Sequence, residues 1–205
     1  MSEQETTERE QFTLAGVNEV VAAQAPDREA LIYGDRRITF AQLAERSRRL
    51  ASYLHSQGLG CHPERSELQP HESGQDHVGQ YLYNGNEYLE SMLGCFKARV
   101  APFNVNYRYV DEELRYLLAD AGTKGLIYHA EFAPTLARVL PALPELRVLL
   151  QVDDGSGEPL LPGAVDYEVA LAEDDPAGPP VEPSPDDLYI LYTGGTTGMP
   201  KGVLW

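Results

Sequence analysis

Ten consecutive residues combine glycines, hydroxyl side chains and one lysine. They run Thr-Gly-Gly-Thr-Thr-Gly-Met-Pro-Lys-Gly over positions 193–202. Glycine permits positive-φ turns and close approach to the backbone, so successive N–H groups can converge on an anion. Threonine hydroxyls and a lysine ammonium would add further donors. The stretch therefore predicts a polyphosphate-binding loop, whose candidate ligand residues are Thr193, Gly194, Gly195, Thr196, Thr197, Gly198 and Lys201.

The spacing differs from that of two other phosphate-binding loops. A Walker A loop has Gly-Lys-Ser/Thr leading into a helix, whereas here Pro200 precedes Lys201 and Gly202 follows it. Proline disfavours the α conformation at Met199, so we expect extended chain after the loop rather than a helix N-terminus. The glycine positions also do not fit the dinucleotide fingerprint. The alternative interpretation is a Gly/Thr-rich hairpin tip without a ligand.

A compact apolar segment at 188–192 predicts a strand that leads directly into the loop. Upstream of it, short apolar segments alternate with stretches whose apolar residues recur at helical spacing. This alternation predicts an α/β fold with a largely parallel sheet and helices on both of its faces. Further strands are expected at 77–83, 125–128 and 146–152, helices at 12–25, 39–58, 89–96, 111–122 and 131–140, and a short hairpin within 29–39.

The helix that begins at Thr39 has the clearest local signals. Thr39 and Gln42, three residues later, form a capping box, and Gly58 can end the helix. We expect its arginines to form a solvated face. They are Arg46, Arg48 and Arg49, opposite an apolar face made by Phe40, Leu43, Ala44, Ser47, Leu50, Ala51 and Leu54.

Acidic residues dominate the charge of the chain. Sixteen Lys and Arg residues against 32 Asp and Glu give a formal net charge of −16. A field of this sign repels phosphate backbones and anionic lipid, which argues against nucleic-acid or membrane-surface binding. Residues 148–200 contain eleven acids and no Lys or Arg. We expect this acidity to be mainly that of a solvated linker, with residues 175–185 as a Pro/Gly-rich acidic connector before the loop.

Cysteine usage and the first residues bear on the compartment. Cys61 and Cys95 have no paired spacing, which fits a reducing environment. The acidic start lacks the pattern of a secretory signal, and no run reaches the ~18 apolar residues of a transmembrane helix. We therefore expect a cytoplasmic protein without a transmembrane segment. His62, His71 and His77 near Cys61 match no compact ligand pattern, so no metal site is predicted.

At the level of motifs, residues 192–203 resemble the phosphate-binding loop of AMP-forming acyl-CoA synthetases and related adenylating enzymes. Residues 38–43 resemble the first core segment of that family, and residues 96–107 with 113–116 resemble the second. The local sequence around Asn84 and Tyr107 is most similar to that of actinobacterial fatty-acyl-CoA synthetases.

The resemblance implies ATP-dependent activation of a carboxylic acid, with a fatty acid as the expected substrate. The acid would form an acyl-adenylate and pyrophosphate, and the acyl group would then pass to the thiol of CoA. Gly195 and Gly198 would shape the phosphate cradle, Thr196 and Thr197 would bind phosphate oxygens, and Lys201 would cover the β- and γ-phosphates. Mg²⁺ would arrive with ATP. No catalytic residue is assigned, because the lysine that helps to form the adenylate follows the loop in relatives.

Some features depart from the family pattern. Gly194 stands where serine is usual, Arg99 where glycine is usual, and the loop at 61–76 is longer than typical. Relatives are well over twice this length, so we interpret residues 1–205 as an incomplete, truncated N-terminal AMP-binding domain. We expect this chain alone not to form acyl-CoA. Two alternatives are an adenylation domain that loads a carrier protein and a non-catalytic remnant. The acyl chain and the oligomeric state are not predicted.

Overall fold

Short apolar segments form a sheet of seven strands in the order β7-β6-β5-β3-β4-β8-β9 in the computed structural model, which describes residues 12–69, 71–193 and 199–205. Adjacent strands pair in parallel, except for the antiparallel pair of β8 and β9. The predicted α/β fold with a largely parallel sheet is confirmed. The strands are β3 His77–Tyr81, β4 Ala101–Asn104, β5 Thr123–His129, β6 Val148–Val152, β7 Ala164–Asp166, β8 Ile190–Thr193 and β9 Lys201–Leu204.

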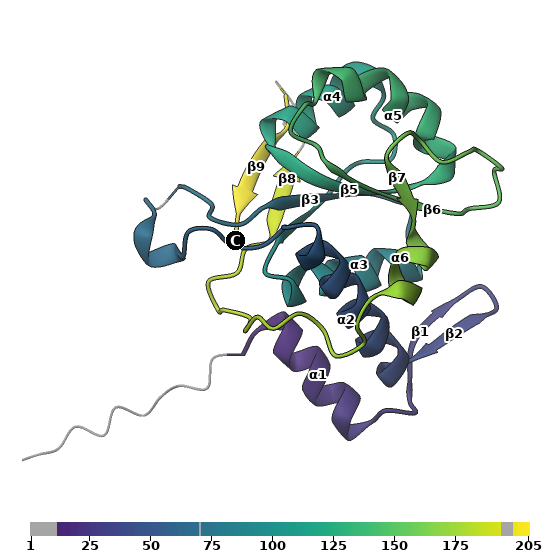
Figure 1. Cartoon of the computed structure of the whole chain (residues 1–205), viewed down its shortest axis with the longest axis vertical. Coiled ribbons are helices and arrows are strands. Elements are labelled where there is room, and N and C mark those ends of the chain that lie inside the picture. Colours follow the sequence, from purple (N-terminus) through teal and green to yellow (C-terminus); the bar gives the residue numbers. More distant parts are fainter. Residues whose placement is uncertain (1–11, 70, 194–198) are drawn as a thin grey trace, which may run out of the picture.

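Helices cover both faces of this sheet, as a parallel sheet requires. Figure 1 shows α4 and α5 on one face and α2, α3 and α6 on the other, with α1 packed beyond α2 and α3. Three 3₁₀ turns, Arg65–Glu67, Ala130–Phe132 and Leu140–Ala142, join these elements in the described residues. The helices are α1 Leu14–Gln24, α2 Phe40–Ser56, α3 Asn86–Lys97, α4 Asp111–Asp120, α5 Ala133–Val139 and α6 Tyr167–Glu173.

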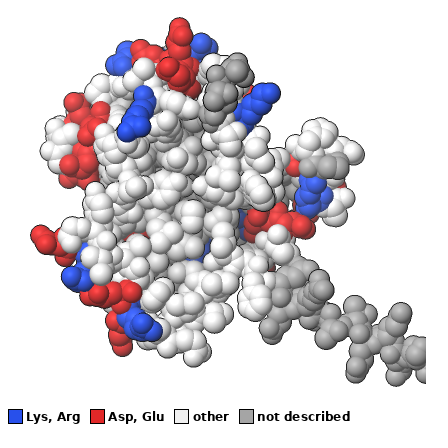
Figure 2. Space-filling model, turned by 180° about the vertical axis from the view of Figure 1, so that it is seen from behind, with Lys and Arg blue, Asp and Glu red and all other residues white. Residues whose placement is uncertain are grey.

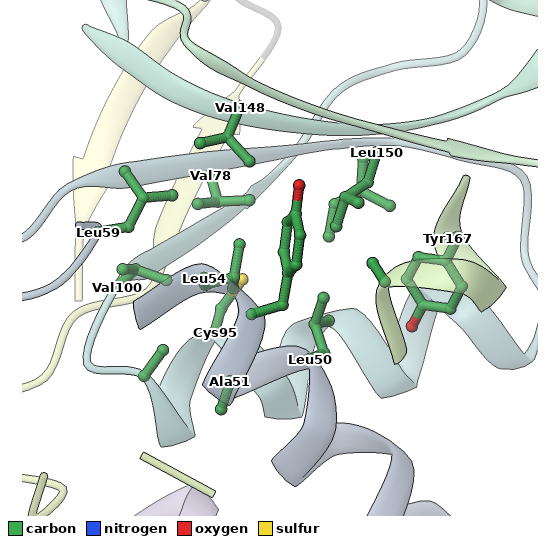
Figure 3. Close-up of a cluster of buried hydrophobic side chains, with 14 of the residues drawn as sticks. Leu50, Ala51, Leu54, Leu59, Val78, Cys95, Val100, Val148, Leu150 and Tyr167 are labelled. Atoms are coloured by element: carbon green, nitrogen blue, oxygen red, sulfur yellow. The ribbon is translucent and has the colours of Figure 1, made fainter. Parts of the chain in front are cut away.

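The core on the α2 side is built from the predicted apolar face of that helix. Leu50 and Leu54 are fully buried and pack with Val78 of β3 and Leu150 of β6 (Figure 3). Cys95 of α3 is also fully buried there, as a small apolar side chain. Burial of this kind is worth roughly 1.5–3 kcal/mol for each large aliphatic side chain, so the leucines of α2 stabilise this layer against the sheet together with α3 and α6.

The N-terminus of α2 forms as its capping box predicts. The backbone N–H of Gln42 donates to Thr39 Oγ1 at 3.3 Å, and the backbone N–H of Thr39 donates to Gln42 Oε1 at 2.9 Å. Just before this cap, β1 Glu29–Tyr33 and β2 Arg36–Thr39 form the predicted hairpin, with Gly34 at φ 56° in its turn.

Some elements differ from the expectations. Strand β4, strand β7 and helix α6 were not predicted, because β4 and β7 have four and three residues and α6 has seven, too few to display a period. The helix expected at 131–140 is a 3₁₀ turn at Ala130–Phe132 followed by α5. Strand β5 is longer than expected by two residues at its start and one at its end.

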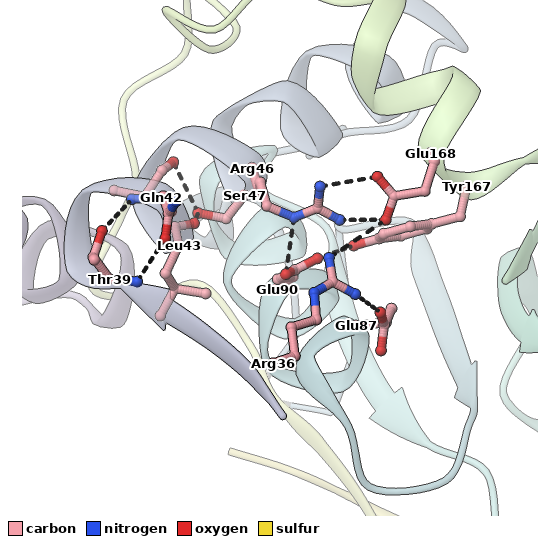
Figure 4. Close-up of polar contacts among 11 residues, drawn as sticks. Arg36, Thr39, Gln42, Leu43, Arg46, Ser47, Glu87, Glu90, Tyr167 and Glu168 are labelled. Carbon is pink, nitrogen blue, oxygen red and sulfur yellow. Dashed lines mark hydrogen bonds and ion pairs between the residues drawn. The ribbon is translucent and has the colours of Figure 1, made fainter. Parts of the chain in front are cut away.

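The expectation that the arginines of α2 form a solvated face is wrong. Arg46 donates to both carboxylate oxygens of Glu168, at 2.9 and 2.6 Å, and its Nε lies 2.9 Å from Glu90 Oε1 (Figure 4). The side chain of Glu90 is 0% exposed. A buried carboxylate needs a charged partner, and Arg46 supplies it by reaching between α3 and α6.

The other two arginines attach the acidic segment to α2. Arg48 Nε donates to the carbonyl of Pro176 at 2.7 Å, and Arg49 Nη1 donates to that of Asp174 at 2.9 Å. Ser52 Oγ donates to the carbonyl of Asp175 at 2.9 Å. The start of the predicted connector is therefore anchored along one helix, although most of its side chains are exposed or half-buried.

The acids of residues 148–200 are also not simply solvated. Asp166 caps α6 by accepting from the N–H of Val169 at 3.0 Å, and Glu168 pairs with Arg46. The side chain of Asp187 is only 6% exposed. Seen from behind, most charged side chains lie near the rim of the molecule (Figure 2). Several acids of residues 148–200 therefore form specific ion pairs or cap a helix.

Candidate phosphate-binding site

The predicted loop joins two paired antiparallel strands. In the register of β8 with β9, Thr193 lies opposite Lys201, and Tyr192 lies opposite Gly202. Directly opposite residues of an antiparallel pair project to the same face. Thr193 and Lys201 therefore share one face of the hairpin, and both are exposed. The chain after Pro200 is a strand, which confirms the expectation of extended chain rather than a helix N-terminus.

The remaining predicted ligand residues, Gly194, Gly195, Thr196, Thr197 and Gly198, lie outside the described residues. Their part in phosphate binding stays a prediction. The geometry brings together the two predicted ligands at the ends of the loop. The strands on either side of the loop pair as a hairpin, which is common to the phosphate-binding interpretation and to its alternative, a hairpin tip without a ligand.

This hairpin lies at the edge of the sheet where ligands of open α/β folds bind. Strand β8 is parallel to β4, with Ile190 beside Phe103, so Thr193 lies at the carboxyl edge of the parallel strands. Ligands of such sheets bind outside the carboxyl ends of the strands, near the point where the strand order reverses. Here β3 has β4 on one side and β5 on the other, so the reversal falls at β3.

His129 at the end of β5 lies at the same edge. Its Nδ1 accepts from the backbone N–H of Tyr83 at 3.0 Å, which places the imidazole proton on Nε2 in the neutral ring. Burial lowers the pKa of His129 below its ordinary value. The ring is therefore a neutral donor beside the tyrosine that follows β3.

The inner face of the hairpin is packed against the layer of α4. Tyr192 lies with its ring centroid 5.9 Å from that of Phe103, and its hydroxyl donates to Asp120 Oδ2 at 2.9 Å. A Cβ at Gly202 would lie 3.0 Å from the Tyr192 ring, so the ring covers the glycine across the strand pair. The hydroxyl of Tyr116 donates to the carbonyl of Pro200 at 3.2 Å. Burial, supported by the bond to Asp120, raises the pKa of Tyr192.

A polar cluster fixes the chain just before β8. Arg99 Nε donates to Asp187 Oδ1 at 3.0 Å, and its Nη atoms donate to both oxygens of Glu64. The amide of Gln75 donates to Asp187 at 3.3 Å and accepts from the N–H of Leu188 at 2.6 Å. Three segments that are distant in the sequence, at 64–75, 99 and 187–188, thus meet just before the β8–β9 hairpin.

Arg99 makes these contacts from an uncommon backbone conformation. Its φ is 56°, the left-handed region that favours glycine, and it follows the C-cap of α3. Arg99 stands where glycine is usual in the family that the chain resembles, and no role was predicted for it. The signal available in the sequence was the arginine in place of glycine. In the structure, a non-glycine residue with positive φ commonly marks a constrained site.

One of the histidines near Cys61, His77, has a structural role. His77 Nδ1 bonds to the carbonyl of Ala121 at 2.5 Å, and its Nε2 bonds to Ser73 Oγ at 2.8 Å. Burial lowers the pKa of His77. Within residues 12–69, 71–193 and 199–205, no group of three or more His, Cys, Asp or Glu side chains could hold a metal ion.

The chain is an α/β protein whose sheet carries a hairpin at its carboxyl edge, and comparison with known families identifies its class. Residues 18–205 match the AMP-binding enzyme family, to which this chain belongs. The chain is 65% identical over 194 residues to the medium-chain acyl-CoA ligase Mig of Mycobacterium avium, covering 95% of this chain and 35% of that protein. The resemblance that the loop suggested is confirmed.

More distant matches are found in sequence and in fold. A medium/long-chain-fatty-acid/3-oxocholest-4-en-26-oate CoA ligase of Mycobacterium marinum is 41% identical over 199 residues, covering 95% of this chain and 34% of that protein. The solved structure of the anthranilate CoA ligase AuaEII has a TM-score of 0.79 at 22% identity, again over 95% of this chain and 34% of that chain. The chain spans about a third of the length of these relatives.

The helices give no indication of a membrane span. None of those in the described part of the chain combines the length and the apolar character needed to cross a bilayer.

Proposed function

We propose that this chain carries the polyphosphate-binding part of an ATP-dependent acyl-CoA ligase. The observation that carries the proposal is the register of the hairpin, which sets Thr193 and Lys201 side by side at the carboxyl edge of the sheet. A hydroxyl and an ammonium at the two ends of a glycine- and threonine-rich loop suit a polyphosphate. Membership in the AMP-binding family supports a nucleotide as its source.

The proposed reaction has two steps. The carboxylate of the acid attacks the α-phosphorus of ATP, forming the acyl-adenylate and releasing pyrophosphate. The thiol of CoA then attacks the acyl carbon, forming the thioester and releasing AMP. Negative charge builds on the departing pyrophosphate during the first step, and preorganised donors stabilise such charge without reorganisation.

The residues of the loop divide this work. Lys201 would neutralise the β- and γ-phosphates, and Thr193, Thr196 and Thr197 would donate hydroxyl hydrogen bonds to phosphate oxygens. Gly194, Gly195 and Gly198 would let the backbone approach the phosphates closely. Mg²⁺ fits as an ion held through the nucleotide phosphates, where it would neutralise further negative charge.

The substrate would be a fatty acid, since the two mycobacterial relatives reported above are named for medium-chain acyl-CoA and for medium- and long-chain fatty acids, and CoA would be the acceptor. We further propose that the reaction takes place in the cytoplasm. Residues 175–185 would act as the connector between the five parallel strands β3 to β7 and the predicted phosphate-binding loop at 193–202.

The test uses a chimera that extends this chain with the remainder of the Mycobacterium avium ligase. We expect the chimera to release pyrophosphate from ATP and to form a thioester when a medium-chain fatty acid and CoA are supplied. Lys201→Ala should slow adenylate formation by roughly 10²-fold, the typical cost of losing one transition-state donor. Lys124→Ala removes the same charge at the opposite edge of the sheet, where Lys124 pairs with Glu145, and should leave the rate unchanged.

Two results would overturn the proposal. An unchanged adenylation rate in Lys201→Ala would remove the role of the loop. Adenylation without CoA-dependent thioester formation, but with transfer to a carrier protein, would favour the carrier-loading alternative. For the isolated 205-residue chain we expect no acyl-CoA formation, and robust turnover in the same assay would contradict that expectation.

A further inference from the structure

Both ends of the phosphate-binding loop are hydrogen-bonded to one helix. Tyr192 immediately precedes Thr193, and its hydroxyl donates to Asp120 Oδ2 at 2.9 Å. Pro200 immediately precedes Lys201, and its carbonyl accepts from the hydroxyl of Tyr116 at 3.2 Å. Residues four apart on a helix lie on the same face, so one face of α4 holds both stems of the hairpin.

Helix α4 is a firm base for these two bonds. Leu114, Leu117 and Leu118 are at most 1% exposed and lie in the core that α4 and α5 form against the sheet. At the other end of α4, Asp111 pairs with Arg138 of α5 at 2.9 Å. Movement of Tyr116 or Asp120 relative to the sheet would therefore disturb a packed layer.

The bonds to α4 and the predicted ligands lie on opposite faces of the hairpin. Tyr192 projects toward α4, whereas Thr193 and Lys201, each one position nearer the loop than the Tyr192–Gly202 pair, project outward. Neither Tyr116 nor Asp120 would touch a bound phosphate. Their effect would be to fix the backbone from which the ligand residues project.

We propose that Tyr116 and Asp120 are positioning residues for the phosphate-binding loop, an inference that rests on the proposed function. By holding both stems before the ligand arrives, they reduce the entropy that is lost when Thr193 and Lys201 are positioned for binding. The polyphosphate then meets Thr193 and Lys201 already on one face. Loss of either bond should weaken polyphosphate binding without unfolding the domain.

Three variants and one control test this inference. Tyr116→Phe deletes the donor to Pro200, and Asp120→Ala deletes the acceptor of Tyr192. Asp120→Asn keeps an acceptor oxygen and should restore wild-type behaviour. Tyr33→Phe is the matched control, because Tyr33 is 57% exposed on β1, away from the hairpin (Figure 1).

The first measurement needs no ligand. Hydrogen exchange of the peptide at 190–204 should become about fivefold faster in Tyr116→Phe and in Asp120→Ala, the factor that matches the net contribution of one hydrogen bond. Exchange of β3 and the thermal unfolding midpoint should change little. Unchanged exchange at 190–204 in both variants would overturn the inference.

The second measurement is the affinity for inorganic pyrophosphate with Mg²⁺, in the chimera described above. We expect it to fall at least threefold in Tyr116→Phe and Asp120→Ala, and to stay at the wild-type value in Asp120→Asn and Tyr33→Phe. Equal affinity in all four variants would overturn the positioning role. If Lys201→Ala also binds pyrophosphate normally, the proposed function fails as well, so the two failures are distinguishable.

Discussion

Replacing Arg99 by glycine and by alanine separates backbone strain from side-chain contacts. Arg99 has φ 56°, and its guanidinium bonds to Asp187 and Glu64. Both substitutions remove the guanidinium. Only glycine removes the steric cost of the left-handed conformation, because alanine keeps the Cβ atom.

The size of each effect follows from the contacts. The side chains of Arg99 and Asp187 are 14% and 6% exposed, so the bond between them is a largely buried, charge-assisted one worth roughly 1.5–3 kcal/mol. Asp187 keeps its bonds from Gln75 and from the N–H of Ser184, which moderates the loss. Alanine in the left-handed region costs roughly 1–2 kcal/mol more than a relaxed residue. We expect Arg99→Ala to lose about 2 kcal/mol of unfolding free energy, and Arg99→Gly to lose about 1 kcal/mol less because glycine relieves the strain that the wild-type arginine already carries.

Equilibrium urea unfolding followed by circular dichroism measures both values. Arg115 supplies the control, since it lies exposed in the middle of α4. There the order should reverse, with Arg115→Gly about 1 kcal/mol less stable than Arg115→Ala. If Arg99→Ala were as stable as Arg99→Gly, or more so, the strained conformation would not be present in solution and the reasoning would fail.

Three further predictions concern the core and the hairpin. Arg46→Ala should lower the unfolding free energy by about 3–5 kcal/mol, because it leaves the buried Glu90 carboxylate without its charged partner. The double variant with Glu90→Gln should recover part of that stability. Urea unfolding of the single and double variants measures both values, and equal stability of the two would contradict the prediction. Burial holds the pKa of His77 below its ordinary value of about 6.5, so below that pH the unfolded chain takes up a proton that the folded one does not. The unfolding free energy should therefore fall between pH 7 and 5, less steeply in His77→Asn, and identical slopes would refute the assignment. Gly202→Ala should lower the thermal midpoint because its Cβ would meet the Tyr192 ring, whereas Gly202→Ala combined with Tyr192→Ala should show no such added loss.

Local signals in the sequence were sufficient for the elements that depend on neighbours along the chain. The capping box at Thr39 and the apolar face through Leu50 and Leu54 specify α2, and both formed as expected. The strand before Thr193 and the extended chain after Pro200 likewise depend on adjacent residues. The parallel sheet then follows from strands that alternate with helices.

Contacts between distant residues could not be predicted in this way. Arg99 and Asp187 are 88 positions apart, and Arg46 and Glu168 are 122 apart. Apolar periodicity tells which face of a helix is buried but not which carboxylate lies across from an arginine. The sequence pattern therefore predicted solvated arginines on α2, although Arg46 contacts a fully buried glutamate, Glu90.

The pairing of Thr193 with Lys201 means that the face on which Lys201 projects depends on the register of β9 with β8: a shift by an odd number of residues reverses it, and a shift by an even number keeps it. A slip of β9 by one residue along β8 would turn Gly202 outward and point Lys201 toward Tyr192 and α4, because strand side chains alternate with a period of two. A slip by two would restore the outward lysine. Substitutions within the loop are thus a different kind of change from a shift in register, since a one-residue shift would keep every residue type and still remove the cation from the side on which Thr193 projects.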